Sequence, residues 1–237
     1  NRTEDKAALM RRPGVESFAV ETTPDANTRA VSGAAIVIIG VKPAMVQNTL
    51  AELAGALAAD ALVISVAAGV TTATMEAAVG QAVLRAMPNT PSLIGKGVTG
   101  LANGSRTSAE QFELGRTVFQ TVGSVVEVPE SQIDALSTIS GSGPAYVFYL
   151  IEELTRSAIG LGFSAAQARE LVTGTFLGSV ELLAASGADP AELRRQVTSP
   201  NGTTERAIAV LETADLAGLF SRAAAAALAR ARELAGL

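Results

Sequence analysis

Apolar runs and segments of helical periodicity alternate over the first 130 residues of the chain. The run at residues 35–41 is mostly β-branched, which is typical of a strand buried on both faces of a parallel sheet. The run at residues 61–66 has the same character. We expect strands at residues 15–20, 35–41, 61–66, 82–87 and 125–128, and helices at residues 3–12, 25–31, 43–57, 72–79 and 108–122.

This succession of strands and helices predicts a doubly wound α/β sheet with right-handed crossovers. Sheets of this kind bind ligands at the carboxyl ends of their strands. The segments that follow three of the expected strands, residues 40–43, 67–70 and 87–91, are rich in small residues or proline. Backbone can approach a ligand closely there. The predicted architecture is a Rossmann-like nucleotide-binding domain.

A domain of this type normally opens with a strand and a glycine-rich phosphate turn of the pattern G-x-G-x-x-G. The chain has no such turn near its start, and Asn1, Arg2 and Thr3 would follow the second strand of the fold. We therefore expect that roughly 30 residues, about one βαβ unit, are missing upstream. A truncated or unresolved segment would explain this, and so would a real loss.

Strand signals stop after Glu130, and no Lys occurs after Lys96. We therefore place a nucleotide-binding domain at residues 1–130 and an all-helical dimerisation domain at residues 131–237. Small residues are densest at 223–227, which permits close approach of helices, and we expect a second subunit to complete this domain as an intertwined dimer. Its helices are expected at residues 132–161, interrupted near 140–144, and at 165–186, 191–197, 204–211 and 216–234.

The amino-acid composition excludes several kinds of catalytic and metal-binding site. The chain has no His and no Cys, which removes the commonest general base, thiol nucleophiles, disulfides and the commonest metal ligands. Its 18 basic and 23 acidic residues are evenly spread, so neither half has the basic face that nucleic acid requires. Hydrophobic residues make up 48% of the chain. The most apolar stretches are nevertheless shorter than the about 20 residues of a membrane-spanning helix. We expect a cytoplasmic protein that binds neither nucleic acid nor membrane and holds no metal ion.

Five short segments carry the functional signal. Each alone is consistent with ordinary turn chemistry, since Gly, Pro, Asn and Ser dominate turns. Their order and spacing make coincidence a poor explanation, and with them the chain resembles the pyrroline-5-carboxylate reductases from its first residues to its C-terminal helix. The segments are V-K-P at residues 41–43, S-V-A-A-G-V-T at 65–71, R-A-M-P-N-T-P at 85–91, S-G-S-G-P-A-Y at 140–146 and T-S-P-N-G-T-T at 198–204.

The resemblance implies a Rossmann domain followed by a helical domain that dimerises by interlocking, with homodimers that often assemble into decamers. It also implies the reduction of a five-membered cyclic imine to L-proline by NADPH, or less often by NADH. A protonated imine already attracts hydride, so the protein needs only to hold and orient its two ligands. The sequence departs from the family at Asn201, where a Gly is common. Because Asn tolerates left-handed backbone, we expect the shape of that loop to survive.

The resemblance implies a substrate site at a predicted helix start, where free N–H groups favour an anion. There the N–H groups of Thr203 and Thr204 would hold the substrate carboxylate, and the Thr204 hydroxyl would bond the imine nitrogen as the catalytic group. The alternatives are that either Thr is merely an N-cap and that Glu130 is an exposed carboxylate at a domain boundary. The implied substrate-binding residues are Glu130, Ser142, Gly143, Pro144, Gly202, Thr203 and Thr204.

The resemblance also implies a set of cofactor contacts. Arg2 suits the 2′-phosphate of NADPH, because an Arg follows the second strand where an acidic residue would bind a free 2′-hydroxyl. An alternative role for Lys42 is that of a catalytic base, although the Pro43 that follows it favours a backbone contact with the cofactor. The implied cofactor-binding residues are Arg2, Asn27, Val41, Lys42, Pro43, Ala67, Ala68 and Gln196.

Two other functions compete with this one. The first is another two-domain NADP-dependent dehydrogenase, but the β-hydroxyacid class relies on a Lys in its helical domain and residues 97–237 contain none. The second is a cofactor-less oligomerisation or binding protein derived from the same family. A strand and glycine-rich turn encoded upstream of Asn1 would favour the enzyme.

Overall fold

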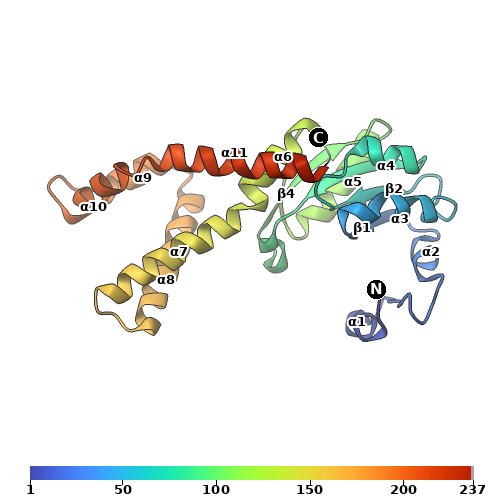
Figure 1. Ribbon diagram of the computed structural model, residues 1–237, viewed down its shortest axis with the longest axis horizontal. Coiled ribbons are helices and arrows are strands. Elements are labelled where there is room, and N and C mark those ends of the chain that lie inside the picture. The colour runs from blue at the N-terminus through green and yellow to red at the C-terminus, as the bar shows by residue number, and fades with distance from the viewer. Residues whose placement is uncertain (236–237) are drawn as a thin grey trace. The chain divides into compact units, whose positions relative to one another are not determined.

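A five-stranded sheet organises the N-terminal part of the chain (Figure 1). The computed structural model describes residues 1–235. The strands lie in the order β1-β2-β3-β4-β5. The first three are parallel, as expected, whereas β4 runs antiparallel to β3 and parallel to β5. Their bounds are β1 (Ile36–Ile39), β2 (Leu62–Ser65), β3 (Ala82–Met87), β4 (Gly97–Asn103) and β5 (Gly123–Glu127).

Two strand predictions fail. β4 is absent from the sequence-based expectation because GVTGLAN has two glycines and no clear alternation, yet Leu101 and Ala102 are fully buried between β3 and β5. The strand predicted at residues 15–20 is wrong in the opposite sense. Val15 makes only an isolated bridge with Arg12, and the segment joins no ladder of the described sheet.

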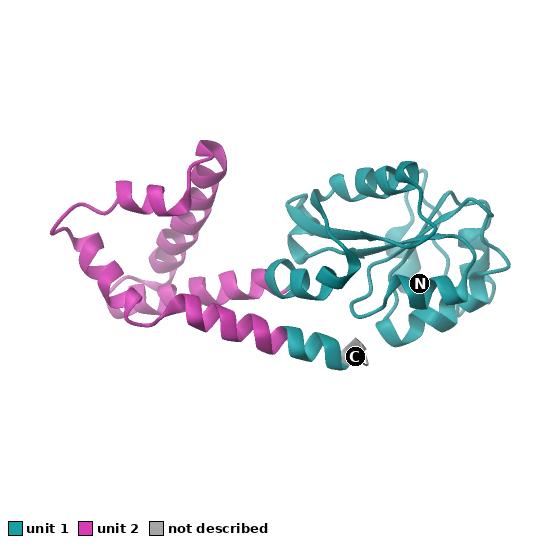
Figure 2. Ribbon diagram, turned by 90° about the horizontal axis from the view of Figure 1, so that it is seen from above, with its two compact units in different colours: residues 1–141, 228–237 teal, residues 142–227 magenta. Residues whose placement is uncertain are grey.

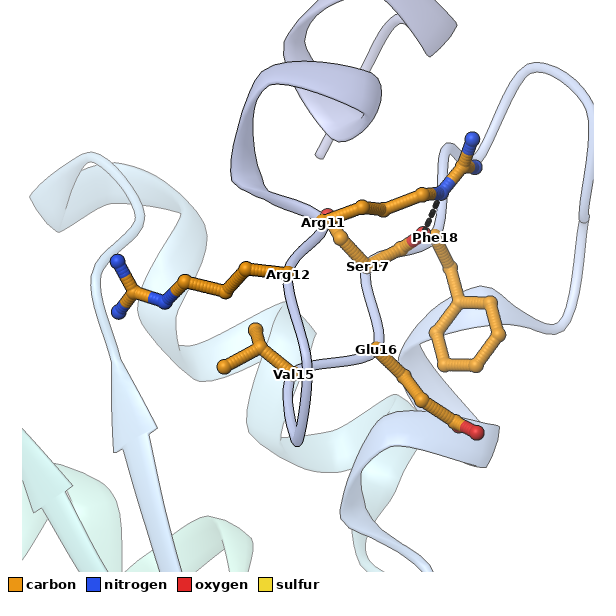
Figure 3. Close-up of a pocket in the computed structure, with 6 residues that line it drawn as sticks. All are labelled: Arg11, Arg12, Val15, Glu16, Ser17 and Phe18. Atoms are coloured by element: carbon orange, nitrogen blue, oxygen red, sulfur yellow. Dashed lines mark hydrogen bonds between the residues drawn. The ribbon is translucent and has the colours of Figure 1, made fainter.

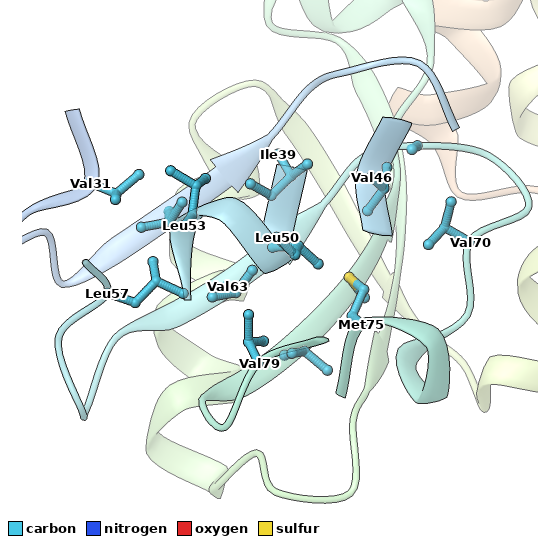
Figure 4. Close-up of a cluster of buried hydrophobic side chains, with 13 residues drawn as sticks. Val31, Ile39, Val46, Leu50, Leu53, Leu57, Val63, Val70, Met75 and Val79 are labelled. Carbon is cyan, nitrogen blue, oxygen red and sulfur yellow. The ribbon is translucent and has the colours of Figure 1, made fainter. Parts of the chain in front are cut away.

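Helices cover both faces of the sheet, as the doubly wound pattern predicts. On one face α3 (Val46–Leu53) and α4 (Thr72–Ala78) pack over the strands and bury an aliphatic cluster (Figure 4). On the other face α5 (Ala109–Gln120) packs on β2, β3 and β4, with Phe112 and Phe119 buried against the sheet.

Burial on both faces holds for β2 but is wrong for β1. All four residues of β2 are buried, whereas Ile38 of β1 is 49% exposed. The position of β1 in the sheet explains the exposure of Ile38. β1 is an edge strand in the described sheet, and α5 lies over β2 to β4 and leaves Ile38 uncovered.

The helix predictions of this half are close to the observed bounds. α1 (Glu4–Met10) begins with two acidic residues, which favour the positive end of a helix. α2 (Ala26–Val31) follows Asp25, although the Asp25 side chain makes no capping bond. The short 3-10 helix η1 (Pro43–Met45) precedes α3, and η2 (Thr90–Ile94) follows β3.

The chain divides into two compact units, residues 1–141 with 228–237 and residues 142–227 (Figure 2). The first compact unit extends to Gly141, beyond the domain boundary expected after residue 130, because the connecting segment packs on the sheet. That segment holds η3 (Glu130–Gln132), α6 (Ile133–Leu136) and a π-helix at Ser137–Gly141. Ile133 is 1% exposed, and α6 contacts β4.

The remaining elements are helical, as expected. The side chains of Ser164 and Gln167 form a capping box at the start of α8, and Gly187 ends it with φ 63. No single helix of the described residues is long and apolar enough to cross a membrane, although α8 and α9, bent by 116°, pass that test together by length and composition. The helices are α7 (Gly143–Gly160), α8 (Ala165–Ser186), α9 (Pro190–Gln196), α10 (Thr203–Glu212) and α11 (Leu216–Ala235), whose end from Leu228 belongs to the first unit.

Candidate active site

The loops at the carboxyl ends of β1, β2 and β3 surround a cavity of about 420 Å³. This is the edge of a parallel sheet at which ligands bind, as the sequence pattern predicts. All lining residues belong to the first unit, and we call this space the strand-end cavity. It is lined by Lys42, Pro43, Ala44, Ala68, Gly69, Arg85, Met87, Asp134, Ser137 and Ala231.

Of the five predicted cofactor residues in these loops, three line the cavity and two do not. Lys42, Pro43 and Ala68 are part of its wall. Val41 packs against the aliphatic core, and Ala67, 6% exposed, donates its N–H to the Ser65 hydroxyl at 3.2 Å. The Ala67 N–H is therefore engaged within the loop.

The cavity wall suits the nicotinamide end of a dinucleotide. Gly69 adopts φ 72, a left-handed conformation that a side chain would strain, so backbone is presented there without a Cβ. Ala44, Ala68 and Met87 supply an apolar surface for a flat ring, and Lys42 supplies a cation at the same wall. The donors present therefore fit the cofactor that the sequence resemblance implies.

Arg85 is a site residue that the sequence analysis missed. It lies near the end of β3 with 3% of its side chain exposed. Its Nη2 donates to Asp134 Oδ1 at 2.5 Å, and its Nη1 lies 3.7 Å from Glu130 Oε1. An Arg in an otherwise apolar strand is a signal, because a buried charge needs a partner. The sequence does not say which carboxylate supplies it.

Glu130, predicted to bind substrate, is occupied by contacts within the protein. Its Oε1 accepts the backbone N–H of Thr72 at 2.6 Å, and its Oε2 accepts the Thr72 hydroxyl at 2.6 Å. The carboxylate thus satisfies the first turn of α4, where unpaired N–H groups favour a negative charge. This side chain is 27% exposed, so the view of it as a freely exposed carboxylate is wrong.

Asn89 joins two of the sequence motifs. Its Nδ2 donates to the Ser140 carbonyl at 2.9 Å, and its Oδ1 accepts the N–H of Val98 at 2.8 Å. The R-A-M-P-N-T-P segment is thereby tied to the π-helix at Ser137–Gly141 and to the start of β4.

The predicted substrate residues of the second unit lie at two helix starts. Thr203 and Thr204 are the first residues of α10, and Gly202, which has no side chain, is its N-cap. The alternative that either Thr is the N-cap is therefore wrong. Asn201 has φ 60, so the expected left-handed loop is confirmed.

The other helix start is that of α7. Ser142 is its N-cap, and Gly143 and Pro144 begin the helix. Figure 1 shows the start of α7 and helix α10 at opposite ends of the second unit. One chain therefore does not bring these two predicted parts of the substrate site together.

Gln196, a predicted cofactor contact, is the last residue of α9. Its Nε2 donates to Glu192 Oε1 at 2.9 Å. Two hydrogen bonds lower the pKa of the Glu192 carboxyl: the larger effect comes from Arg195 and the smaller from Gln196. Gln196 also lines an apolar cavity of about 290 Å³ between α8 and α9.

The two cofactor-binding residues predicted near the N-terminus lie in different surroundings. Asn27 lines a cavity of about 170 Å³ with Asn1 and Phe18, whereas Arg2 is exposed and lines none of the cavities described here. A neighbouring open cavity of about 520 Å³ carries two other arginines (Figure 3). Arg11 Nε donates to the Ser17 carbonyl at 3.0 Å, and the Arg12 side chain points away from it.

Within the described residues, no group of three or more Asp or Glu side chains is placed to hold a metal ion.

Comparisons with known proteins agree with these features. Residues 130–234 match the family model for pyrroline-5-carboxylate reductase dimerisation, and residues 1–69 match that for NADP oxidoreductase, coenzyme F420-dependent. A solved pyrroline-5-carboxylate reductase from Coxiella burnetii is similar with a TM-score of 0.91 and 38% identity, covering 99% of this chain and 86% of that one. The Plasmodium falciparum pyrroline carboxylate reductase, solved with NADP bound, has a TM-score of 0.80 and 27% identity, covering 88% of this chain and 80% of that one.

Two curated relatives are similar over almost the whole chain. The pyrroline-5-carboxylate reductase of Corynebacterium melassecola is 39% identical, covering 99% of this chain and 87% of its own length. That of Pseudomonas aeruginosa is 40% identical, covering 99% of this chain and 86% of its own length. Similarity of this degree over both units shows that the chain belongs to the pyrroline-5-carboxylate reductase family.

Proposed function

We propose that this chain reduces L-1-pyrroline-5-carboxylate to L-proline with NADPH, or less readily with NADH, as the last step of proline biosynthesis. The observation that carries the proposal is the strand-end cavity, formed by segments that match the family's motifs in a chain that resembles named reductases along 99% of its length. We further propose the cytoplasm as its location.

The first unit would hold the cofactor. Lys42, Pro43 and Ala68 would flank the nicotinamide and its ribose, with backbone contacts from Val41 and Ala67. Arg2 and Asn27 would hold the adenosine end, Arg2 through the 2′-phosphate that favours NADPH, and Gln196 would add a contact from the helical unit. When bound, the cofactor supplies a hydride.

The second unit would hold the substrate. The N–H groups of Thr203 and Thr204 have no capping side chain, because Gly202 is the N-cap, so they are suited to an anion such as the substrate carboxylate. The Thr204 hydroxyl would orient the ring nitrogen. The carbon of the protonated C=N bond accepts the hydride, and the π electrons of that bond become the lone pair of the amine nitrogen.

A homodimer would complete the site. Ser142, Gly143 and Pro144 of one chain would meet α10 of the partner, which fits their separation within one chain. Large apolar side chains exposed on α7 and α8, such as Phe148 at 64% and Val180 at 63%, support burial by a second copy. The match to the dimerisation family model supports the same assembly, and we propose decamers built from such dimers. We keep Glu130 as a substrate neighbour, with its carboxylate engaged by Thr72.

Thr204 provides the test of this mechanism. In an NADPH-oxidation assay with the cyclic imine and the full-length protein, Thr204→Ala should lower kcat about 10- to 150-fold, because a hydrogen bond to a charged group contributes roughly 1.5–3 kcal/mol. NADPH binding should not change. Thr204→Ser keeps the hydroxyl and should recover most of the rate, and Thr203→Ala is the matched control with a mild effect.

Two outcomes contradict the proposal. Near wild-type kcat for Thr204→Ala would remove the hydroxyl from the mechanism. An absence of NADPH oxidation by the wild-type protein would instead favour a cofactor-less binding protein or a different dehydrogenase.

A further inference from the structure

Arg85 is a buried cation that the proposed mechanism does not use. Its neighbours on β3, Val83 and Leu84, are fully buried and apolar. A charge in such surroundings is costly unless it is paired. Its Nε is buried without a hydrogen-bond partner in the described part of the chain, so the terminal nitrogens supply the pairing, to Asp134 and Glu130.

The two carboxylates belong to the segment that contributes Asp134 and Ser137 to the wall of the strand-end cavity. Glu130 lies on η3 and Asp134 on α6, and the π-helix follows directly. The Ser137 hydroxyl donates to the Asp134 carbonyl at 2.7 Å. Asp134 and Ser137 both line the cavity, as does Lys42 of the loop after β1. Arg85 therefore connects the strand at the cavity floor to this wall.

The chemistry of the contact requires an Arg. A guanidinium presents several donors in a planar fork and can reach two carboxylates at once, whereas the ammonium of Lys is a point charge. Glu130 also holds Thr72 at the start of α4, so one cation links β3, η3, α6 and α4.

We propose that Arg85 is a positioning residue: it sets the distance between the cofactor loops and the segment from Asp134 to Gly141. The proposal rests on the proposed reductase function. In this proposal the guanidinium contacts no reacting atom. Its effect comes from holding both walls of the cavity in the geometry that hydride transfer needs, and a misplacement of about 1 Å can cost roughly 100-fold in rate.

The experiment separates positioning from simple charge compensation. Arg85→Lys keeps the charge and loses the fork, and Arg85→Met loses both. The double variant Arg85→Met with Asp134→Asn also removes the nearer of the two carboxylates, while Glu130 keeps its bonds to Thr72. Arg116→Lys is the control for loss of the fork outside the cavity. Arg116 on α5, 32% exposed against 3% for Arg85, also contacts two carboxylates, Glu113 at 3.4 Å and Glu127 at 3.6 Å. The readouts are kcat, KM for each ligand, NADPH affinity from its fluorescence, and Tm.

We expect Arg85→Lys to lower kcat by about 10-fold or more while NADPH affinity stays unchanged, and Arg116→Lys to leave both unchanged. The double variant should regain the Tm that Arg85→Met loses, but not its kcat. If the double variant regains both, Arg85 only compensates charge and the proposal is overturned. Wild-type kcat in Arg85→Lys overturns it as well. A wild-type protein that does not oxidise NADPH with the imine defeats the proposed function first, and this inference with it.

Discussion

Replacing Glu130 by Gln tests whether its carboxylate stabilises the start of α4 or binds the substrate. The substitution keeps the shape of the side chain and removes its charge. Both carboxylate oxygens accept bonds from Thr72, one from the backbone N–H and one from the hydroxyl, each at 2.6 Å. An amide has one acceptor oxygen, which can take the Thr72 N–H, and its NH₂ group can then donate to the Thr72 hydroxyl, which also accepts, so both bonds become neutral ones.

The expected loss follows from these two bonds. A hydrogen bond to a charged group contributes about 1.5–3 kcal/mol, and a neutral one about 0.5–1.5 kcal/mol. Exchanging two charged bonds for two neutral ones should therefore lower the free energy of unfolding by about 2.5 kcal/mol at mid-range values. The substitution also removes one of the two counter-charges of the buried Arg85, at 3.7 Å, which adds to this loss.

The assay is denaturant unfolding at neutral pH, with every variant at the same protein concentration because an oligomer's stability depends on it. Thr72→Val removes the hydroxyl partner with little change of shape, and the pair of variants makes a double-mutant cycle. KM for the imine should change little. Stability within about 0.5 kcal/mol of wild type, together with a strongly raised KM, would refute the reasoning and return Glu130 to the substrate.

Two further predictions concern the loops that build the cavity and the sheet. Asn89→Ala leaves the Val98 N–H and the Ser140 carbonyl without partners and should lower the free energy of unfolding by about 1–3 kcal/mol for each group, measured by denaturant unfolding. An unchanged midpoint would show that Asn89 does not hold the π-helix. Gly123→Ala should prevent folding, because Gly123 has φ 147 and a Cβ there would overlap the Gly97 carbonyl. Gly80→Ala, with open space around its Cβ, is the control, and equal yields of folded protein would contradict this prediction.

Elements whose signals are local could be predicted from the amino-acid sequence. β3 occupies the predicted residues 82–87, and α8 occupies the predicted residues 165–186, which end at a glycine with φ 63. The left-handed turn at Asn201 follows from the tolerance of one residue type for one backbone conformation. Such features depend on neighbours within a few positions, so a pattern along the chain is enough to predict them.

The motifs also placed part of the candidate site. Lys42, Pro43 and Ala68 line the strand-end cavity because parallel strands bring the loops at their carboxyl ends to one edge. Arg85, Asp134 and Ser137 line the same cavity and were not predicted. The motif that contains Arg85 resembles the family's, but resemblance alone does not show that this side chain turns toward a cavity wall.

Only the tertiary structure decided the pairings between distant residues. Arg85 meets Asp134, 49 positions along the chain, and Thr72 meets Glu130, 58 positions along. The antiparallel course of β4 and the exposure of Ile38 also depend on which elements lie alongside. A sequence reveals that a buried charge needs a counter-charge. Which carboxylate supplies it is settled by the packing of η3 and α6 on the sheet, because the energy of an ion pair depends on distance and burial, which no local pattern contains.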